Sequence, residues 1–276
     1  MTDVKIVVDS SADLLSMDGI SFASAPLKIH AEDQRFVDNA ELDVVGMVEF
    51  LYSYKGKSST SCPNTEDWFS AFGDAERIFC ITITSNLSGS YNAARVAKDE
   101  YEAKYPGRKI ALIDSYSTGP EMALMAEKIR ELAMAERSFE EIAEYMKDYK
   151  TELLFVLESM KNLANNGRVS KIAATLAGFL GIRAVGRASD VGTLEMLGKF
   201  RGTPATITAV TGYMKDMSYF GGRVIISHCL NEKCAEELRD AIHHLYPRAD
   251  ISVRECRGLC SFYAERGGFL VGFETA

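Results

Sequence analysis

The stretch 4-VKIVVDSS-11 is a short run of apolar residues that ends in small polar ones. The same design returns in 77-RIFCITITS-85 and 109-KIALIDS-115, and a helical pattern follows each of them. Strands that are apolar throughout are typical of a parallel sheet covered on both faces. Strands alternating with helices therefore predict an α/β fold, with a mainly parallel sheet in the N-terminal half and helices on both its faces.

Capping signals mark the helices between these strands. Pro120 suits the first turn of a helix, and Ser138 with Glu141 has the spacing of a capping box. Asn64 or Thr65 can cap a helix whose apolar stripe begins at Trp68. One helix is predicted to begin at residue 64 or 65. Three more are predicted at 88–105, 120–136 and 139–151.

The second half of the chain repeats the alternation from residue 152 onward. A break at Gly167 separates a helix that starts near 160 from a second, apolar helix. Further strands are expected at 152–159, 185–197, 222–230, 250–256 and 268–274, with helices at 204–217 and 232–246. A Gly/Ser-rich bend is expected between the last two strands. We predict an N-terminal lobe (1–152), a smaller C-terminal α/β lobe (153–276) and a pocket between them.

Composition excludes several classes of protein. With 31 Lys and Arg against 39 Asp and Glu, the net charge is −8, which argues against a partner that is nucleic acid. No segment reaches the roughly 18 apolar residues of a membrane helix, and the N-terminus does not resemble a signal peptide. We therefore expect a cytoplasmic protein without stable membrane insertion. The six cysteines show no C-x-x-C pair or metal-ligand spacing, so reduced thiols and no metal site are expected.

Two clusters rich in hydroxyl groups, 58-SSTSCPN-64 and 84-TSNLSGSYN-92, stand next to predicted helix starts. Hydroxyls beside the free N–H groups of a helix start bind carboxylate or phosphate well. Gly89 in the second cluster lets the backbone approach such a head group. The alternative is that these Ser and Thr residues only cap helices, and the pattern leaves both interpretations open.

The segment 161-KNLANNGRVSK-171 places three basic residues, Lys161, Arg168 and Lys171, around an Asn-Asn-Gly turn. It is a solvated helix junction, the rim of a pocket, or a docking face for an acidic partner. The apolar run 172–182 that follows is either core or the wall of an acyl tunnel.

Six segments together resemble the DegV family of bacterial fatty-acid-binding proteins, in the family's order and over essentially the whole chain. They are 6-IVVDSSADL-14, 60-TSCP-63, 87-LSGSYNAA-94, 113-IDS-115, 160-MKNLANNGRVSK-171 and 199-KFRG-202. The resemblance implies a two-lobed fold with one long-chain fatty acid, and no other cofactor, between the lobes. It implies that Thr60, Ser61 and Ser88 hold the carboxylate, with Gly89 and Ser90 nearby. It also implies a carrier without catalytic activity of its own, which presents the acid to a separate fatty acid kinase.

The tail departs from the family pattern. Family members commonly carry G-T-H-x-G-P-G there, whereas this chain has 255-ECRGLCSFYAERGGFLVGFE-274, with Tyr263 in place of the histidine. A tyrosine can donate a hydrogen bond to a head group but carries no positive charge near pH 7. One alternative is therefore a binder or enzyme for another small carboxylate or phosphate. Ser88 or Ser61 would then be the nucleophile and His228 the base.

Overall fold

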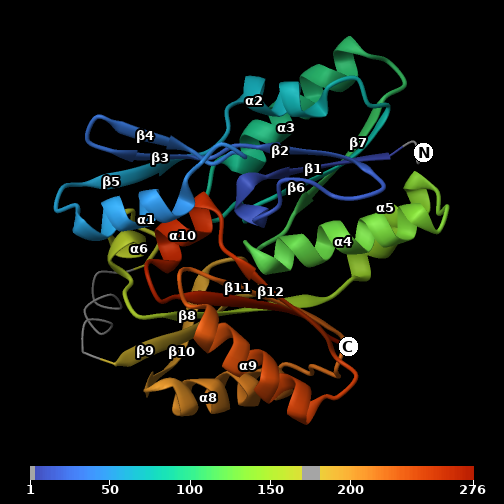
Figure 1. Cartoon of the computed structure of the whole chain (residues 1–276). Coiled ribbons are helices and arrows are strands. Elements are labelled where there is room, and N and C mark those ends of the chain that lie inside the picture. Colours follow the sequence, from blue (N-terminus) through green and yellow to red (C-terminus); the bar gives the residue numbers. More distant parts are fainter. Residues whose placement is uncertain (1–3, 170–180) are drawn as a thin grey trace.

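The computed structural model describes residues 4–169 and 181–276. Four parallel strands form the first sheet, in the order β2-β1-β6-β7 (Figure 1). The strands are β1 (Val4–Asp9), β2 (Ser21–Ala25), β6 (Arg77–Thr82) and β7 (Lys109–Asp114). The parallel sheet predicted from the apolar runs is confirmed, and β2 joins it as a strand that the sequence analysis did not predict.

Helices cover both faces of this sheet, as predicted. They are α2 (Thr65–Phe72) and α3 (Ser90–Lys104) on one face, and α4 (Pro120–Met134) and α5 (Phe139–Asp148) on the other. Successive residues of β1 alternate between the faces, so Val7 packs among Trp68 and Tyr101, whereas Ile6 packs with Ile129. Asn64 caps α2, and Ser138 caps α5, each in a full capping box.

A three-stranded antiparallel sheet extends the N-terminal half, in the order β4-β3-β5. Its strands are β3 (Lys28–Ala31), β4 (Gln34–Val37) and β5 (Ser58–Ser61), and α1 (Val44–Ser53) lies between β4 and β5 in the chain. None of these four elements was predicted. The first hydroxyl cluster therefore lies mostly on a strand and reaches the start of α2 only through the turn that follows.

The second sheet has six strands, in the order β10-β9-β8-β13-β11-β12. They are β8 (Thr151–Leu157), β9 (Ile182–Ala188), β10 (Leu194–Arg201), β11 (Arg223–His228), β12 (Asp250–Glu255) and β13 (Phe269–Glu274). Its pairs are antiparallel except β11 with β12. The strand positions were predicted, whereas the mainly antiparallel pairing was not, because β13 returns to the sheet centre between β8 and β11.

The remaining described helices are α6 (Lys161–Asn165), α8 (Thr203–Asp216), α9 (Glu232–Leu245) and α10 (Gly258–Ala264). Helix α10 occupies the position of the predicted bend, so that prediction was wrong. The carboxylate of Asp38 accepts hydrogen bonds from the N–H groups of Gly258 and Leu259, both at 2.8 Å, and so holds the start of the helix. The predicted second apolar helix after Gly167 lies outside the described residues.

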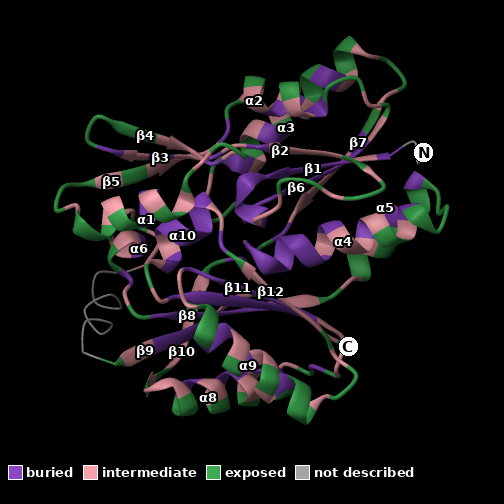
Figure 2. Cartoon of the chain, viewed as in Figure 1, coloured by how far each residue is buried: buried purple, intermediate pink, exposed green. Residues whose placement is uncertain are grey.

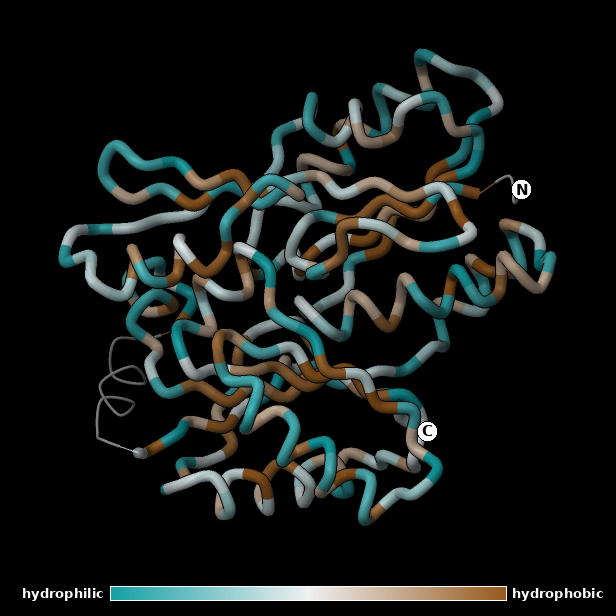
Figure 3. Tube along the Cα trace, in the orientation of Figure 1, coloured by the Kyte–Doolittle hydropathy of each residue, from teal (hydrophilic) through white to brown (hydrophobic). Residues whose placement is uncertain are grey.

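Helix α4 lies between the two sheets and packs against both of them (Figure 1). Its N-terminal half is buried, and apolar strands of the two sheets lie on either side of it (Figures 2 and 3). On the far side of the second sheet, α8 and α9 cover a separate core that includes Val156 and Val210. We propose to divide the chain at 152/153 into the two lobes named above. No helix in the described part of the chain is long and apolar enough to cross a bilayer.

Candidate functional site

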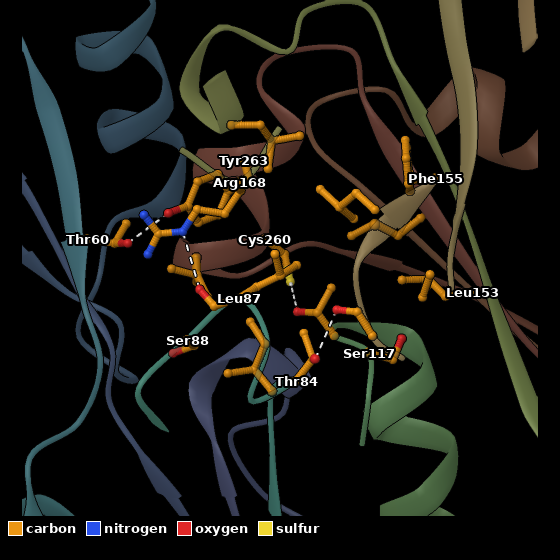
Figure 4. Close-up of a pocket in the computed structure, with 18 of the residues that line it drawn as sticks. Thr60, Thr84, Leu87, Ser88, Ser117, Leu153, Phe155, Arg168, Cys260 and Tyr263 are labelled. Atoms are coloured by element: carbon orange, nitrogen blue, oxygen red, sulfur yellow. Dashed lines mark hydrogen bonds between the residues drawn. The ribbon is translucent and has the colours of Figure 1, made fainter. Parts of the chain in front are cut away.

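The carboxyl ends of three strands bring the hydroxyl clusters together. Thr60 and Ser61 end β5, the loop after β6 carries Ser88 and Gly89, and the loop after β7 carries Ser117. Ligands of open α/β sheets bind at the carboxyl edge of the parallel strands, to which β6 and β7 belong. All five residues line one cavity of about 280 Å³ between the two sheets (Figure 4). The end of β5, a strand of the antiparallel sheet, therefore lines the same cavity.

The opposite wall of the cavity comes from the second sheet and the helices beside it. Leu153, Phe155 and Leu157 are alternate residues of β8 and therefore share one face of the sheet. Apolar side chains form most of the remaining wall: Leu27, Ile83, Leu87, Leu163, Ala188, Leu194, Leu259, Ala264 and Leu270. Apolar side chains thus make up most of the cavity wall, and Thr60 and Tyr263 lie across the cavity from Phe155 (Figure 4).

Hydrogen bonds hold the hydroxyl side chains around Thr60 in place. Thr60 Oγ1 lies 2.8 Å from the hydroxyl of Tyr263, which α10 carries across from the C-terminal lobe (Figure 4). Ser61 Oγ lies 2.9 Å from Nε2 of His30 on β3. Ser88 Oγ accepts a hydrogen bond from Ser90 N at 3.2 Å, which leaves the Ser88 proton available to an acceptor. These hydroxyls are held in place and still have hydrogen-bonding capacity to spare.

Gly89 and Cys62 also line the cavity and contact each other. A Cβ atom at Gly89 would lie 3.3 Å from Cys62 Sγ, so a larger residue there would crowd the cavity wall. Burial raises the pKa of the Cys62 thiol, which therefore stays neutral at physiological pH. The pair contributes close packing and no charge.

Arg168 lines the cavity, which agrees with the pocket-rim interpretation of its segment and not with the docking face. Its Nε donates to the carbonyl of Leu87 at 3.3 Å, and its Nη1 donates to the carbonyl of Asn166 (Figure 4). Among the described residues that line the cavity, Arg168 alone carries a charged side chain. Lys161 is exposed and does not line the cavity, and Lys171 lies outside the described residues.

Ser90 points away from the cavity and is fully buried. Its hydroxyl donates to Asp9 Oδ2 at 2.6 Å, and Ile83 N donates to the same oxygen at 2.9 Å. Asp9 therefore joins the end of β1 to the loop after β6, and Ser90 belongs to this link and not to the cavity lining. The link between Asp9 and Ser90 spans 81 positions in the chain.

Two side chains of the N-terminal lobe hold the turn between β9 and β10, which closes one side of the cavity. Thr84 Oγ1 donates to the carbonyl of Gly192 at 2.9 Å, and Asn86 Nδ2 donates to that of Val191 at 2.6 Å. Thr84 belongs to the second hydroxyl cluster, but the sequence offers no sign of this contact, because its partner lies 108 residues away.

The histidine proposed as a base is not at the cavity. His228 ends β11, and its Nδ1 accepts a hydrogen bond from Asn231 N at 3.4 Å beside the start of α9. Burial lowers the pKa of its imidazole. His30 is the ring that contacts Ser61 instead. In the described ranges, no three His, Cys, Asp or Glu side chains gather as metal ligands.

The comparisons with known proteins agree with this arrangement of fold and cavity. The family model described as "Uncharacterised protein, DegV family" matches residues 3–275. This chain belongs to the DegV family. A DegV domain-containing protein of Streptococcus pneumoniae is 44% identical over 276 residues, which cover 98% of each chain.

Solved structures of other DegV proteins carry fatty acids. A DegV family protein from Eubacterium eligens, loaded with heptadecanoic acid, has a TM-score of 0.97 at 40% identity and covers 99% of this chain and 100% of its own. The Streptococcus pneumoniae Fatty Acid Kinase (Fak) B3 protein, loaded with linoleic acid, has a TM-score of 0.97 at 43% identity and covers both chains fully. The family and fold expected from the sequence resemblance are therefore confirmed.

Proposed function

We propose that this protein binds one long-chain fatty acid in the cavity between its lobes and presents the carboxylate to a separate fatty acid kinase. The observation that carries the proposal is a largely apolar cavity that has Arg168 and hydroxyl groups on the side opposite Phe155 of β8 (Figure 4). The fatty acids named for the two relatives support the same ligand class.

The apolar part supplies most of the binding free energy. Burying about 14 methylenes at ~0.8 kcal/mol each gives a gross driving force of roughly 11 kcal/mol before the costs of association. Each hydrogen bond to the ionised carboxylate adds about 1.5–3 kcal/mol. The hydroxyl groups therefore select and orient the head group, while the acyl chain determines whether the acid binds at all.

Thr60, Ser61 and Ser88 are proposed to donate to the carboxylate, and Arg168 to balance its charge. Tyr263 acts through Thr60 in this proposal. Burial raises the pKa of the Tyr263 hydroxyl, so it stays protonated. When Tyr263 donates to Thr60 Oγ1, the proton of Thr60 is directed to the ligand. Tyr263 thus takes part in binding without a positive charge.

Binding of palmitate and of hexadecanol, which lacks the carboxylate, tests the carboxylate site. We expect Tyr263→Phe to weaken palmitate binding about tenfold, because one hydrogen bond to Thr60 is lost, and to leave hexadecanol binding unchanged. Tyr145→Phe is the matched control, since Tyr145 is exposed on α5, away from the cavity. If native mass spectrometry and titration find no fatty acid on the wild-type protein, the proposed function is wrong.

The kinase partnership is a proposal that the name of the Streptococcus pneumoniae relative supports. Lys161 is exposed on α6, and we propose that it faces the kinase. Arg168, from the same segment, lines the cavity instead. Purified protein and a fatty acid kinase should form acyl phosphate only together. Lys161→Glu should slow that reaction while palmitate affinity stays at the wild-type value, and an unchanged rate would remove Lys161 from the docking face.

A further inference from the structure

Strand β8 lines the cavity with three of its side chains. Leu157, Phe155 and Leu153 succeed one another on the cavity face, with about 6.6 Å between neighbours on that face. Phe155 and Leu153 lie on the far side of the cavity from Thr60 and Tyr263 (Figure 4). An acyl chain whose carboxylate lies at Thr60 therefore directs its methyl end toward Phe155.

The ring of Phe155 lies over a glycine on the next strand. Phe155 is 2% exposed and pairs with Gly186 of β9 in the sheet register. A Cβ atom at Gly186 would lie 2.2 Å from Phe155 Cζ, so the ring occupies the space that a side chain would fill. The glycine lets the ring lie down on β9 and keeps it out of the centre of the cavity.

The neighbouring strand and helix limit the cavity beyond Leu153. Gly272 of β13 pairs with Leu153, and a Cβ atom at Gly272 would lie 2.7 Å from the backbone of Pro120 and Glu121. The first turn of α4 thus sits directly on the sheet beside Leu153. Backbone closes this side. Of the three β8 side chains that line the cavity, Phe155 is the largest, so shortening it adds the most room for the methyl end.

We infer that Phe155, seated on Gly186, is the residue that sets the acyl-chain length that the cavity accepts; this inference rests on the proposed function. Shortening the side chain at 155 exposes the glycine surface of β9 and adds room at the methyl end. The substitution leaves the groups around the carboxylate unchanged. It should therefore alter how strongly the affinity depends on the length of the acyl chain. A purely structural role for Phe155 would lower stability and affinity for all acids alike.

Dissociation constants for saturated acids of 12, 14, 16, 18 and 20 carbons test the inference. Phe155→Ala and Phe155→Leu should raise the affinity for the 20-carbon acid relative to the 14-carbon acid. The expected gain is roughly fourfold for each further methylene accommodated. The leucine variant removes less volume and keeps the test possible if the alanine variant does not fold. Val156→Ala is the control, because Val156 is buried on the opposite face of β8.

The outcomes separate the inference from the proposed function. If both Phe155 variants bind acids but keep the wild-type ratio of 20-carbon to 14-carbon affinity, the proposed role of Phe155 is wrong. An equal change in Val156→Ala also overturns it, since loosening of the sheet would then explain the effect. A wild-type protein that binds none of the acids would instead refute the proposed function.

Discussion

Two buried carboxylates join α10 to the N-terminal lobe, and α10 carries Tyr263 to the cavity. Asp13 Oδ1 accepts a hydrogen bond from Arg257 N at 2.7 Å, and Asp38 accepts the two that start the helix. Asp13 Oδ2 is buried and has no hydrogen-bond partner in the described part of the chain. Burial raises the pKa of Asp13 to about 8, and the nearby Asp38 carboxylate adds to the shift. The charged form of Asp13 therefore destabilises the folded state.

Asp13→Asn should make the protein less sensitive to alkaline pH. Between the ordinary aspartate pKa and about 8, folded wild-type protein binds a proton that the unfolded chain releases. Stability from this group is therefore present at low pH and is lost as the pH rises through about 8. Urea unfolding at pH 6 and at pH 9 gives the free energy of unfolding at each pH. Between the two, this free energy should fall by about 2–3 kcal/mol more in the wild type than in Asp13→Asn.

Asp148→Asn is the control for that measurement, because Asp148 is exposed at the end of α5. It should lose as much stability as the wild type over the same pH interval. Burial also raises the pKa of Glu121, to about 7, and both proteins share its contribution. Equal losses in Asp13→Asn and the wild type would mean that the Asp13 carboxylate is ionised in the folded protein at neutral pH.

Residues of the site could be predicted where small polar residues follow the end of a strand or where a family motif marks them. Thr60, Ser61, Ser88, Gly89 and Tyr263 all reach the cavity, as the hydroxyl clusters and the resemblance indicated. Their roles toward a ligand stay predictions. For Arg168 the sequence left a pocket rim and a docking face open, and for Ser90 it did not predict the position away from the cavity. The contacts that decide both positions come from distant segments, Leu87 for Arg168 and Asp9 for Ser90.

The turn between β9 and β10 shows how one element of the C-terminal lobe fits the other lobe. Gly192 has a φ of +72°, and a Cβ atom there would lie 2.1 Å from Thr84 Oγ1 and 2.9 Å from the Tyr116 Cα. Close approach and backbone conformation therefore both require glycine. With Thr84 and Asn86 bound to its carbonyls, the turn forms a fixed side of the cavity.

Gly192→Ala should destabilise the protein by more than the backbone conformation alone explains. A left-handed alanine costs about 1 kcal/mol, and displacing Thr84 adds the loss of a buried hydrogen bond of similar size. Gly107→Ala is the control, since Gly107 has a φ of +97° and a Cβ atom there would meet nothing within 4 Å. Chemical denaturation should show a larger loss of unfolding free energy for Gly192→Ala than for Gly107→Ala. Equal losses would show that the close contact between Gly192 and Thr84 does not contribute to stability.

Helices and strands whose capping or apolar pattern lies within the element could be predicted from the sequence. Those that depend on contacts with residues far along the chain could not. The helix after Ser138 was found because its capping box lies within four residues. Helix α10 was missed because its sequence is rich in small residues and its start is capped by Asp38, 220 positions away. The short strands β3 and β5 are polar or flanked by polar residues, and only their pairing reveals them.

The whole molecule encloses its cavity with walls from both lobes, and α4 packs against both sheets. The sequence predicted two α/β lobes with a pocket between them. It did not predict the antiparallel order of the second sheet, because apolar strand patterns do not specify which neighbour a strand will choose. In this sheet β13, the last strand of the chain, inserts between β8 and β11.

Ligand binding should stabilise both lobes together. Palmitate held at 100 times its dissociation constant adds about 2.7 kcal/mol if only the folded protein binds it. Calorimetry should then show one unfolding transition that moves to higher temperature with palmitate and moves little with octanoate, whose chain reaches less of the apolar wall. Two transitions, of which only one responds, would indicate that a single lobe forms the binding site.

The contacts that fasten the β9–β10 turn end on main-chain oxygens of Val191 and Gly192, so the identity of the side chain at 191 is immaterial to them. Val191 is 60% exposed, while its neighbour Gly192 lines the cavity. A cysteine introduced there and labelled with an environment-sensitive dye would place an optical reporter at the edge of the cavity. Filling and emptying could then be followed in real time without altering the groups that do the binding.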